Sequence, residues 1–418
     1  MTDETSASIP DLTPAITLTE DQQRAVNMIA SEPICLFTGL PGSGKSYSLK
    51  AVLERLRMQK DSVLLSAPTG KAARRMTEAT GVPATTVHRM LEYHPEEGFR
   101  YNEANKLGVK QIVIDEASML DTELMAAVCK AIDPSRTRLC LTGDDNQLPS
   151  VGPGRVVGDL IASGVVPRVD LTQVHRAAAE SWICRSAPLI RDGICPDLTD
   201  TKDFAFWQVN SLEDAEDAVL EAVTGVEKGH GVRPAVITPR RTKVTACTET
   251  INPKLQQLLN PDGMQTGFRT GDGAIIRIGD LLLQRSNDYN LGVFNGELGT
   301  VVDVVQGKGD DKHHQLIVHF EDHEEVSYVN RLAAFKTRLG YALTAHSCQG
   351  SQYPWIVVIC HSGHGKMLNR QILYTMVTRA AKGVILIGDR AGLHRALAIS
   401  APPSRKTGLV ERVQGKLT

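Results

Sequence analysis

Residues 39–46, GLPGSGKS, constrain the fold of this chain more than any other stretch. They follow a short apolar run at residues 34–37 and precede a helical pattern at residues 47–58. The motif G-x-x-x-x-G-K-[ST] between a strand and a helix is typical of a phosphate-binding loop, because its glycines let backbone N–H groups surround phosphate oxygens at a helix N-terminus. The predicted phosphate ligands are Gly39, Pro41, Gly42, Ser43, Gly44 and Lys45, and Ser46 is expected to hold Mg²⁺.

Two later apolar runs end in side chains that suit nucleotide chemistry. The run at residues 111–114 leads into Asp115 and Glu116, and the run at residues 138–143 leads toward Gln147. Ligands of open α/β sheets bind at the carboxyl ends of the strands. We therefore expect Asp115 to hold Mg²⁺, Glu116 to polarise the attacking water and Gln147 to lie beside the γ-phosphate.

The periodicity of the chain predicts an α/β fold with two parallel-sheet domains and two insertions. Residues 267–338 change to a period of two with many Gly, Asp and Asn turns, which is typical of a small β-barrel. The predicted boundaries are a flexible N-terminus at 1–17, a first α/β domain at 18–176 with a β-hairpin at 92–108, a second α/β domain at 177–266 and 339–400 that is interrupted by the barrel, and a weakly structured tail at 401–418.

The second α/β domain lacks a phosphate loop but has cations at the ends of its predicted strands and helices, namely Arg240, His346 and Arg379. One nucleotide between two such domains is typical of a motor. Cations of the second domain would complete the γ-phosphate site when the cleft closes, as arginine fingers do.

Composition limits the other classes of function. The formal net charge is only −2, so any nucleic-acid binding must use a local groove. The eight cysteines form no C-x-x-C pair, and we expect free thiols in a reducing cytoplasm. Asp3 and Glu4 without a following apolar core argue against a signal peptide, and no apolar run approaches the roughly 18 residues of a membrane span. Cys360, His361 and His364 lack a second ligand pair, which argues against a zinc site.

Some features have two interpretations from the residues alone. Gln22 completes a capping-box pattern with Thr19, and it is also a candidate for reading an adenine edge before a phosphate loop. The aromatic hairpin around Phe99 is either a surface loop or a wedge. Lys71, Arg74 and Arg75 either form a solvated helix face or contact nucleic acid.

Motifs follow one another in an order that points to one family. They are carried by Gln22, by the phosphate loop and by residues 67–73, 86–89, 115–118, 143–149, 174–176, 279–299, 344–352 and 374–379. With these motifs the chain resembles superfamily 1 helicases of the RecD-like, 5′→3′ class, which includes the Dda-type phage helicases. The resemblance implies two RecA-like domains, an SH3-like barrel and a hairpin that acts as a pin. It covers residues 18–389, most of the chain.

The resemblance also implies a mechanism. ATP with Mg²⁺ would close the cleft, Arg176 and Arg379 would act as fingers on the γ-phosphate, and single-stranded DNA would move across both domains while duplex is unwound ahead. The implied DNA contacts are Pro68, Thr69, Lys71, Thr86, His88, Phe99, Thr344 and His346. The expected partners are single-stranded DNA and duplex junctions. A single-stranded-DNA-binding protein or replication and recombination proteins would be further partners of a monomeric enzyme in the cytoplasm of a bacterial or phage-infected cell.

Three positions depart from the family pattern, and two other functions stay open. Ser347 stands where the family usually has Lys, Gln352 where it usually has Glu, and His175 where it has an aromatic residue. An RNA helicase of the Upf type shares these motifs. A nucleotide-gated nucleic-acid-binding subunit of a recombination complex is the alternative from another class. DNA replication, repair and recombination are all compatible with the sequence.

Overall fold

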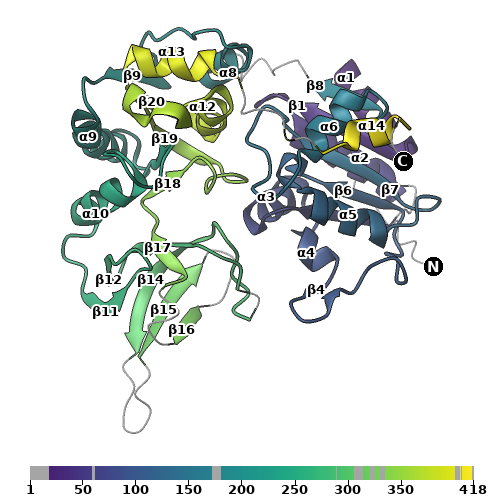
Figure 1. The fold of residues 1–418 in the computed structure, drawn as a ribbon, viewed down its shortest axis with the longest axis horizontal. Helices are drawn as coiled ribbons and strands as arrows, with labels where there is room; N and C mark the ends of the chain where they lie inside the picture. Colours follow the sequence, from purple (N-terminus) through teal and green to yellow (C-terminus); the bar gives the residue numbers. More distant parts are fainter. Residues whose placement is uncertain are drawn as a thin grey trace, which may run out of the picture.

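The computed structural model describes residues 18–58, 62–171, 180–288, 290–305, 314–320, 325–329, 335–400, 405 and 407–416. Figure 1 shows two lobes, one formed by the first part of the chain and one by the later part, with an antiparallel sheet below the second lobe. The predicted α/β class with two RecA-like parallel sheets is confirmed. The predicted flexible segment 1–17 lies outside the described residues, as do His175 and Arg176.

The first lobe is a parallel sheet with strand order β3-β2-β6-β7-β1-β8. Successive side chains of a strand face opposite sides of a sheet. Leu36 accordingly packs with α5 and α6, whereas Cys35 and Phe37 pack with α1 and α2 on the other face. The elements are α1 (Glu20–Ser31), β1 (Ile34–Gly39), α2 (Lys45–Met58), β2 (Val63–Ala67), α3 (Gly70–Thr80), β3 (Ala84–Thr86), β6 (Gln111–Ile114), α5 (Thr122–Ala131), β7 (Arg138–Gly143), α6 (Val156–Ser163) and β8 (Arg168–Leu171).

The second lobe is a parallel sheet with strand order β18-β10-β19-β20-β9. Its elements are α8 (Trp182–Asp192), β9 (Phe204–Gln208), α9 (Leu212–His230), β10 (Ala235–Thr238), α10 (Thr248–Leu259), β18 (Ala342–Thr344), β19 (Tyr353–Cys360), α12 (Arg370–Val377), β20 (Ala380–Gly388) and α13 (Arg390–Ala398). β9 is an edge strand that follows a polar stretch, and β20 begins at Ala380, before the apolar run at residues 384–387. Pairing of Ala380 with Tyr353 of β19 extends β20 beyond its apolar run.

Between the two sequence segments that form the second lobe, the chain forms an antiparallel five-stranded sheet with order β16-β15-β14-β13-β17, in the range where the barrel was predicted. Its strands are β13 (Leu281–Gln284), β14 (Leu298–Val305), β15 (Gln315–Phe320), β16 (Val326–Val329) and β17 (Thr337–Leu339). Residues Ile275–Arg277, within the range predicted for the barrel, form β12, which pairs with β11 (Gln265–Arg269) in a separate two-stranded ribbon. Buried residues of the antiparallel sheet share one apolar core with α9 and α10, so the barrel is packed directly onto the second lobe.

The predicted hairpin is present but small. It consists of β4 (Tyr93–His94) and β5 (Gly98–Phe99), directly after α4 (Val87–Met90). Phe99 is half-buried beside β4, with its ring 4.9 Å from that of Tyr93 and 6.0 Å from that of His88. The residues between the two short strands, 95–97, are exposed.

The end of the chain returns to the first lobe as α14 (Leu409–Val413), which lies beside α6 in Figure 1. Gln414 Nε2 donates to Ser163 O over 2.8 Å, and Arg405 Nη1 donates to Gly154 O over 2.9 Å. Expecting a weakly structured tail was therefore wrong for residues 407–416, because tertiary contacts stabilise a helix too short to form alone. None of the described helices has the length and apolar character needed to cross a membrane.

Candidate nucleotide site and nucleic-acid surface

The loop between β1 and α2 has the backbone of an anion site. Gly42 and Gly44 adopt φ values of 74° and 84°, which side chains other than glycine rarely tolerate. A Cβ atom on Gly39 would lie 2.7 Å from Ser43 Oγ, so this position also requires glycine. Lys45 begins α2, and its Nζ donates to Gly39 O. The positive helix end, the ammonium group and the turned backbone together fit a polyphosphate.

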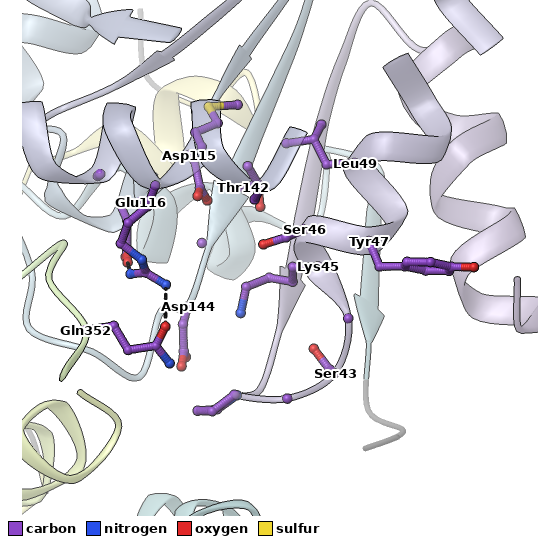
Figure 2. A pocket seen from close by; sticks show the side chains of 18 of the residues that line it. Ser43, Lys45, Ser46, Tyr47, Leu49, Asp115, Glu116, Thr142, Asp144 and Gln352 are labelled. Atoms are coloured by element: carbon purple, nitrogen blue, oxygen red, sulfur yellow. Dashed lines mark hydrogen bonds and ion pairs between the residues drawn. The ribbon is translucent and has the colours of Figure 1, made fainter. Parts of the chain in front are cut away.

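The loop opens into a cavity of about 1050 Å³ that is lined from both lobes. Figure 2 shows Lys45 and Ser46 on one side and Glu116 on the other, with Asp115 above them and Gln352 of the second lobe below Glu116. The predicted ligands Pro41, Gly42, Ser43, Gly44, Lys45 and Ser46 all line this cavity, whereas Gly39 contributes its carbonyl to Lys45.

Two carboxylates follow β6 at the floor of the cavity. Burial raises the pKa of Asp115, and the charge of Glu116 raises it further, while Lys45 and Arg75 oppose the shift. Glu116 has a left-handed backbone, with φ of 49°, so the two side chains leave the strand in different directions. A divalent cation between Ser46 and Asp115 would stabilise the charged form of this buried carboxylate. The donor set of hydroxyl and carboxylate oxygens fits Mg²⁺.

Arg379 brings the second lobe to the same cavity. It is only 3% exposed, its Nη1 lies 3.7 Å from Glu116 Oε1, and its Nη2 donates to Gln147 Oε1. Nη1 also donates to Ser351 O over 3.2 Å. Among the described residues, its Nε has no hydrogen-bond partner. The structure therefore gathers Lys45, Glu116, Gln147 and Arg379 around one space, while Arg176 cannot be placed because it lies outside the described residues.

Gln22 forms the predicted capping box. The N–H of Thr19 donates to Gln22 Oε1 over 3.0 Å, and the N–H of Gln22 donates to Thr19 Oγ1 over 3.3 Å. The cap is thus observed, and Gln22 is 1% exposed at the start of α1. Its role in reading adenine stays a prediction.

A second, cationic cavity of about 370 Å³ lies on the second lobe. It contains Thr344 and His346, both predicted to bind DNA, and it is lined further by Arg240, Arg241, Lys243 and Arg338. Burial and the neighbouring Arg285 and Arg241 lower the pKa of Arg338. Arg338 Nε has no hydrogen-bond partner in the described part of the chain. Gathered cations of this kind suit a phosphate backbone.

Of the three cations expected at the ends of strands and helices in the second domain, Arg240 and His346 line the cationic cavity, whereas Arg379 lines the nucleotide cavity. Sequence reasoning missed Lys243 and Arg338. Arg338 is distant in sequence from Arg240, Arg241 and Lys243. It comes near them because β18, which directly follows β17, pairs with β10, and β10 ends just before Arg240.

The remaining predicted DNA residues lie at helix starts of the first lobe. Thr69 and Thr86 are the N-caps of α3 and α4, accepting from Ala72 N and Arg89 N over 3.2 Å each. Lys71 lies in the first turn of α3, and Pro68 directly precedes the cap. His88 packs against the hairpin rings, and burial lowers its pKa. Their contacts with DNA stay predictions.

Family models match three parts of the chain. A model described as an AAA domain covers residues 17–205, the SH3 domain of ATP-dependent RecD-like DNA helicases covers 251–320, and the C-terminal domain of UvrD-like helicases covers 339–387. They follow the order of the first lobe, the antiparallel sheet and the end of the second lobe.

Curated relatives match along nearly the whole chain. The ATP-dependent RecD2 DNA helicase of Deinococcus radiodurans is 34% identical over 95% of this chain, which spans only 52% of that protein. The RecBCD enzyme subunit RecD of Mycolicibacterium smegmatis is 30% identical over 94% of this chain and 75% of its own length. The chain thus spans about half the length of the first relative and three quarters of the second.

A solved structure shares the fold at low identity. The Pif1 helicase from Candida albicans has a TM-score of 0.53 at 16% identity, with 96% of this chain and 98% of that chain covered. Three domain matches in one order, and a relative 30% identical over most of its own length, show that the chain belongs to the RecD-like family of superfamily 1 helicases.

Proposed function

We propose that this chain is an ATP-dependent DNA helicase that moves 5′→3′ on single-stranded DNA and unwinds duplex ahead of it. One observation carries the proposal. Arg379 of the second lobe meets Glu116 and Gln147 of the first lobe at the cavity of the phosphate loop. Because both lobes contribute residues to this site, its geometry changes when the lobes separate. A motor requires such coupling between nucleotide site and lobe movement. The name of one relative, a DNA helicase, supports the choice of DNA, and the direction is proposed from the resemblance to the RecD-like class.

ATP is the proposed substrate of the shared cavity, with Mg²⁺ as its cation. The turned backbone and Lys45 bind the phosphates, while Ser46 and Asp115 hold Mg²⁺, which supplies charge neutralisation when bound. Glu116 holds and polarises the attacking water. Gln147 and Arg379 orient the γ-phosphate and stabilise the negative charge that develops on it.

Single-stranded DNA is proposed to bind the cationic cavity of the second lobe and the starts of α3 and α4 in the first lobe. The two surfaces would be separate grips, so a change in lobe separation changes the distance between them. Arg240, Arg241, Lys243 and Arg338 supply charge for phosphates. The hairpin at Phe99 is proposed as the pin at the duplex junction.

A strand-displacement assay tests the proposal most directly. Matched duplexes carry a 5′ tail, a 3′ tail or no tail, and ATP hydrolysis is measured with single-stranded DNA and RNA of one sequence. We expect ATP-dependent displacement of the 5′-tailed duplex only, and stronger stimulation by DNA. Stronger stimulation by RNA would support the Upf-type alternative. Hydrolysis without displacement would support the nucleotide-gated subunit. The RecD relatives are named as subunits of the RecBCD enzyme, which is compatible with such a role.

Cellular context is part of the proposal. The relatives come from bacteria. We propose a cytoplasmic enzyme of a bacterial or phage-infected cell, acting in DNA replication, repair or recombination. We propose that it acts as a monomer on single-stranded DNA and duplex junctions, near single-stranded-DNA-binding or recombination proteins.

A further inference from the structure

Arg75 of α3 joins the two lobes at the edge of the nucleotide cavity. Its Nη2 donates to Gln352 Oε1 over 3.0 Å, the bond drawn as a dashed line in Figure 2, and its Nη1 donates to Gly350 O over 3.4 Å. The same Nη1 lies 4.0 Å from Glu116 Oε1. One guanidinium therefore contacts the turn at residues 350–352 of the second lobe and the carboxylate proposed to hold water.

Glu116 lies between two guanidinium groups. Arg379 approaches the same Oε1 to 3.7 Å, from the second lobe. The side chain of Glu116 is 13% exposed, whereas that of Arg75 is 41% exposed. Two cations on one largely shielded oxygen fix its position more firmly than an exposed pair would. Arg75 is the member of this set that lies in the same lobe as Glu116.

The turn at residues 350–352 also packs on the start of α3. Gly350 has φ of 72°, and a Cβ atom there would lie 2.7 Å from Oγ1 of Thr69, the N-cap of α3. Since a helix moves as a rigid unit, a shift of this turn relative to Thr69 changes the surroundings of Arg75. The α3 helix thus connects a surface proposed to bind DNA with the nucleotide cavity.

We propose that Arg75 is a positioning residue that holds Glu116 for hydrolysis and links its position to the turn at residues 350–352. The inference rests on the proposed ATPase function. Because Gln352 is a neutral amide, it accepts a hydrogen bond from Arg75 without neutralising the guanidinium, and the positive charge of Arg75 still acts on Glu116. A carboxylate at position 352 would form an ion pair with Arg75 and compete with Glu116.

The test compares Arg75→Ala, Arg75→Lys and Arg233→Ala in ATP hydrolysis stimulated by single-stranded DNA. Arg233 is the matched control, because it is a half-exposed arginine that pairs with Glu227 at 2.8 Å and lines neither the nucleotide cavity nor the cationic cavity. For Arg75→Ala we expect kcat to fall about tenfold while KM for ATP changes less than about threefold, since a lost contact to a charged group affects the reacting arrangement more than substrate binding. Arg75→Lys should have a kcat between those of Arg75→Ala and the wild type, because lysine keeps the positive charge but lacks the planar guanidinium with its several N–H donors.

Gln352→Glu gives an independent arm that keeps Arg75. We expect it to lower kcat several-fold alone and to have no further effect together with Arg75→Ala, because both act through one guanidinium. Equal kcat for Arg75→Ala and Arg233→Ala, a rise in KM alone, or additive effects of Arg75→Ala and Gln352→Glu would overturn the inference. A wild-type protein without DNA-stimulated hydrolysis would instead overturn the proposed function. If Arg75→Ala does not fold, the Lys and Glu variants decide.

Discussion

At the residue scale, the chemistry of the nucleotide cavity depends on a few polar and charged side chains whose positions are fixed by the residues around them. Lys45 is the one whose position the local sequence alone determines, because the loop and the helix start are contiguous with it. Glu116, Gln147 and Arg379 come from three separated segments and meet only in the folded molecule. Their convergence could be predicted from family resemblance but not from spacing.

Lys45→Ala should reduce DNA-stimulated ATP hydrolysis by about 10²-fold or more, since a preorganised charge on the phosphates is lost. Lys50→Ala, an exposed position on the same helix, is the control and should retain full activity. Turnover is measured with saturating single-stranded DNA, and thermal unfolding checks the fold. Normal turnover by Lys45→Ala would show that the loop is not the nucleotide site.

His364 gives a prediction about pH. It is fully buried, its Nε2 lies 3.2 Å from Ala246 O, and burial lowers its pKa to about 4 from an ordinary value of 6.5. Because the folded state favours the neutral ring, its contribution to stability is fully present above pH 6.5 and is lost as the pH falls toward 4. The shift corresponds to at most about 3 kcal/mol.

Urea unfolding between pH 7.5 and 4.5 measures this effect. We expect the wild type to lose stability over that range and His364→Asn to lose less of it, because the variant has no ring to protonate. Identical pH profiles would contradict the assignment. Burial also lowers the pKa of His88, so part of the pH dependence should remain in the variant.

At the element scale, the sequence predicted the strands that surround the site better than the elements that depend on tertiary pairing. The phosphate loop, β6 and β7 were predictable because apolar runs end abruptly in polar residues. The edge strand β9 was not, since its residues Phe204–Gln208 follow a polar stretch and are held by pairing with β20. The helix α14 was missed for a similar reason: its partner, α6, is distant in sequence.

The hairpin is the element whose role is least determined by its geometry. Phe99 packs against Tyr93 and His88, so it stabilises the hairpin as well as forming part of its surface. Phe99→Ala should lower strand displacement more than single-strand-stimulated hydrolysis, because a pin acts ahead of the motor. Both rates are measured on one protein preparation, with its unfolding temperature. Equal losses in the two assays would argue against a pin.

At the scale of the whole molecule, the two lobes are joined by a set of buried hydrogen bonds between the segment after β7 and helix α12. Tyr374 Oη donates to Asp144 Oδ2 over 2.6 Å, and Leu148 N donates to Thr375 Oγ1 over 2.9 Å. Arg405 adds a contact from the chain end to the carbonyl groups of Gly152 and Gly154. The segment that follows β7 is thus held both by the second lobe and by the returning chain end.

Tyr374→Phe should shift the molecule toward separated lobes. The substitution removes a donor and leaves a buried Asp144 oxygen without it, at a cost of about 1.5–3 kcal/mol in the closed arrangement, a cost that opening relieves. We expect a larger radius of gyration by X-ray scattering and weaker coupling of hydrolysis to strand displacement.

Tyr341→Phe is the matched control for this change. Tyr341 Oη donates over 2.9 Å to Asp280, a buried carboxylate within the second lobe and its barrel, so the same bond is lost without crossing between the lobes. This variant should lose stability but keep the radius of gyration of the wild type. A similar radius for both variants would show that the bond to Asp144 does not hold the lobes together, and that their separation is set elsewhere along the shared surface.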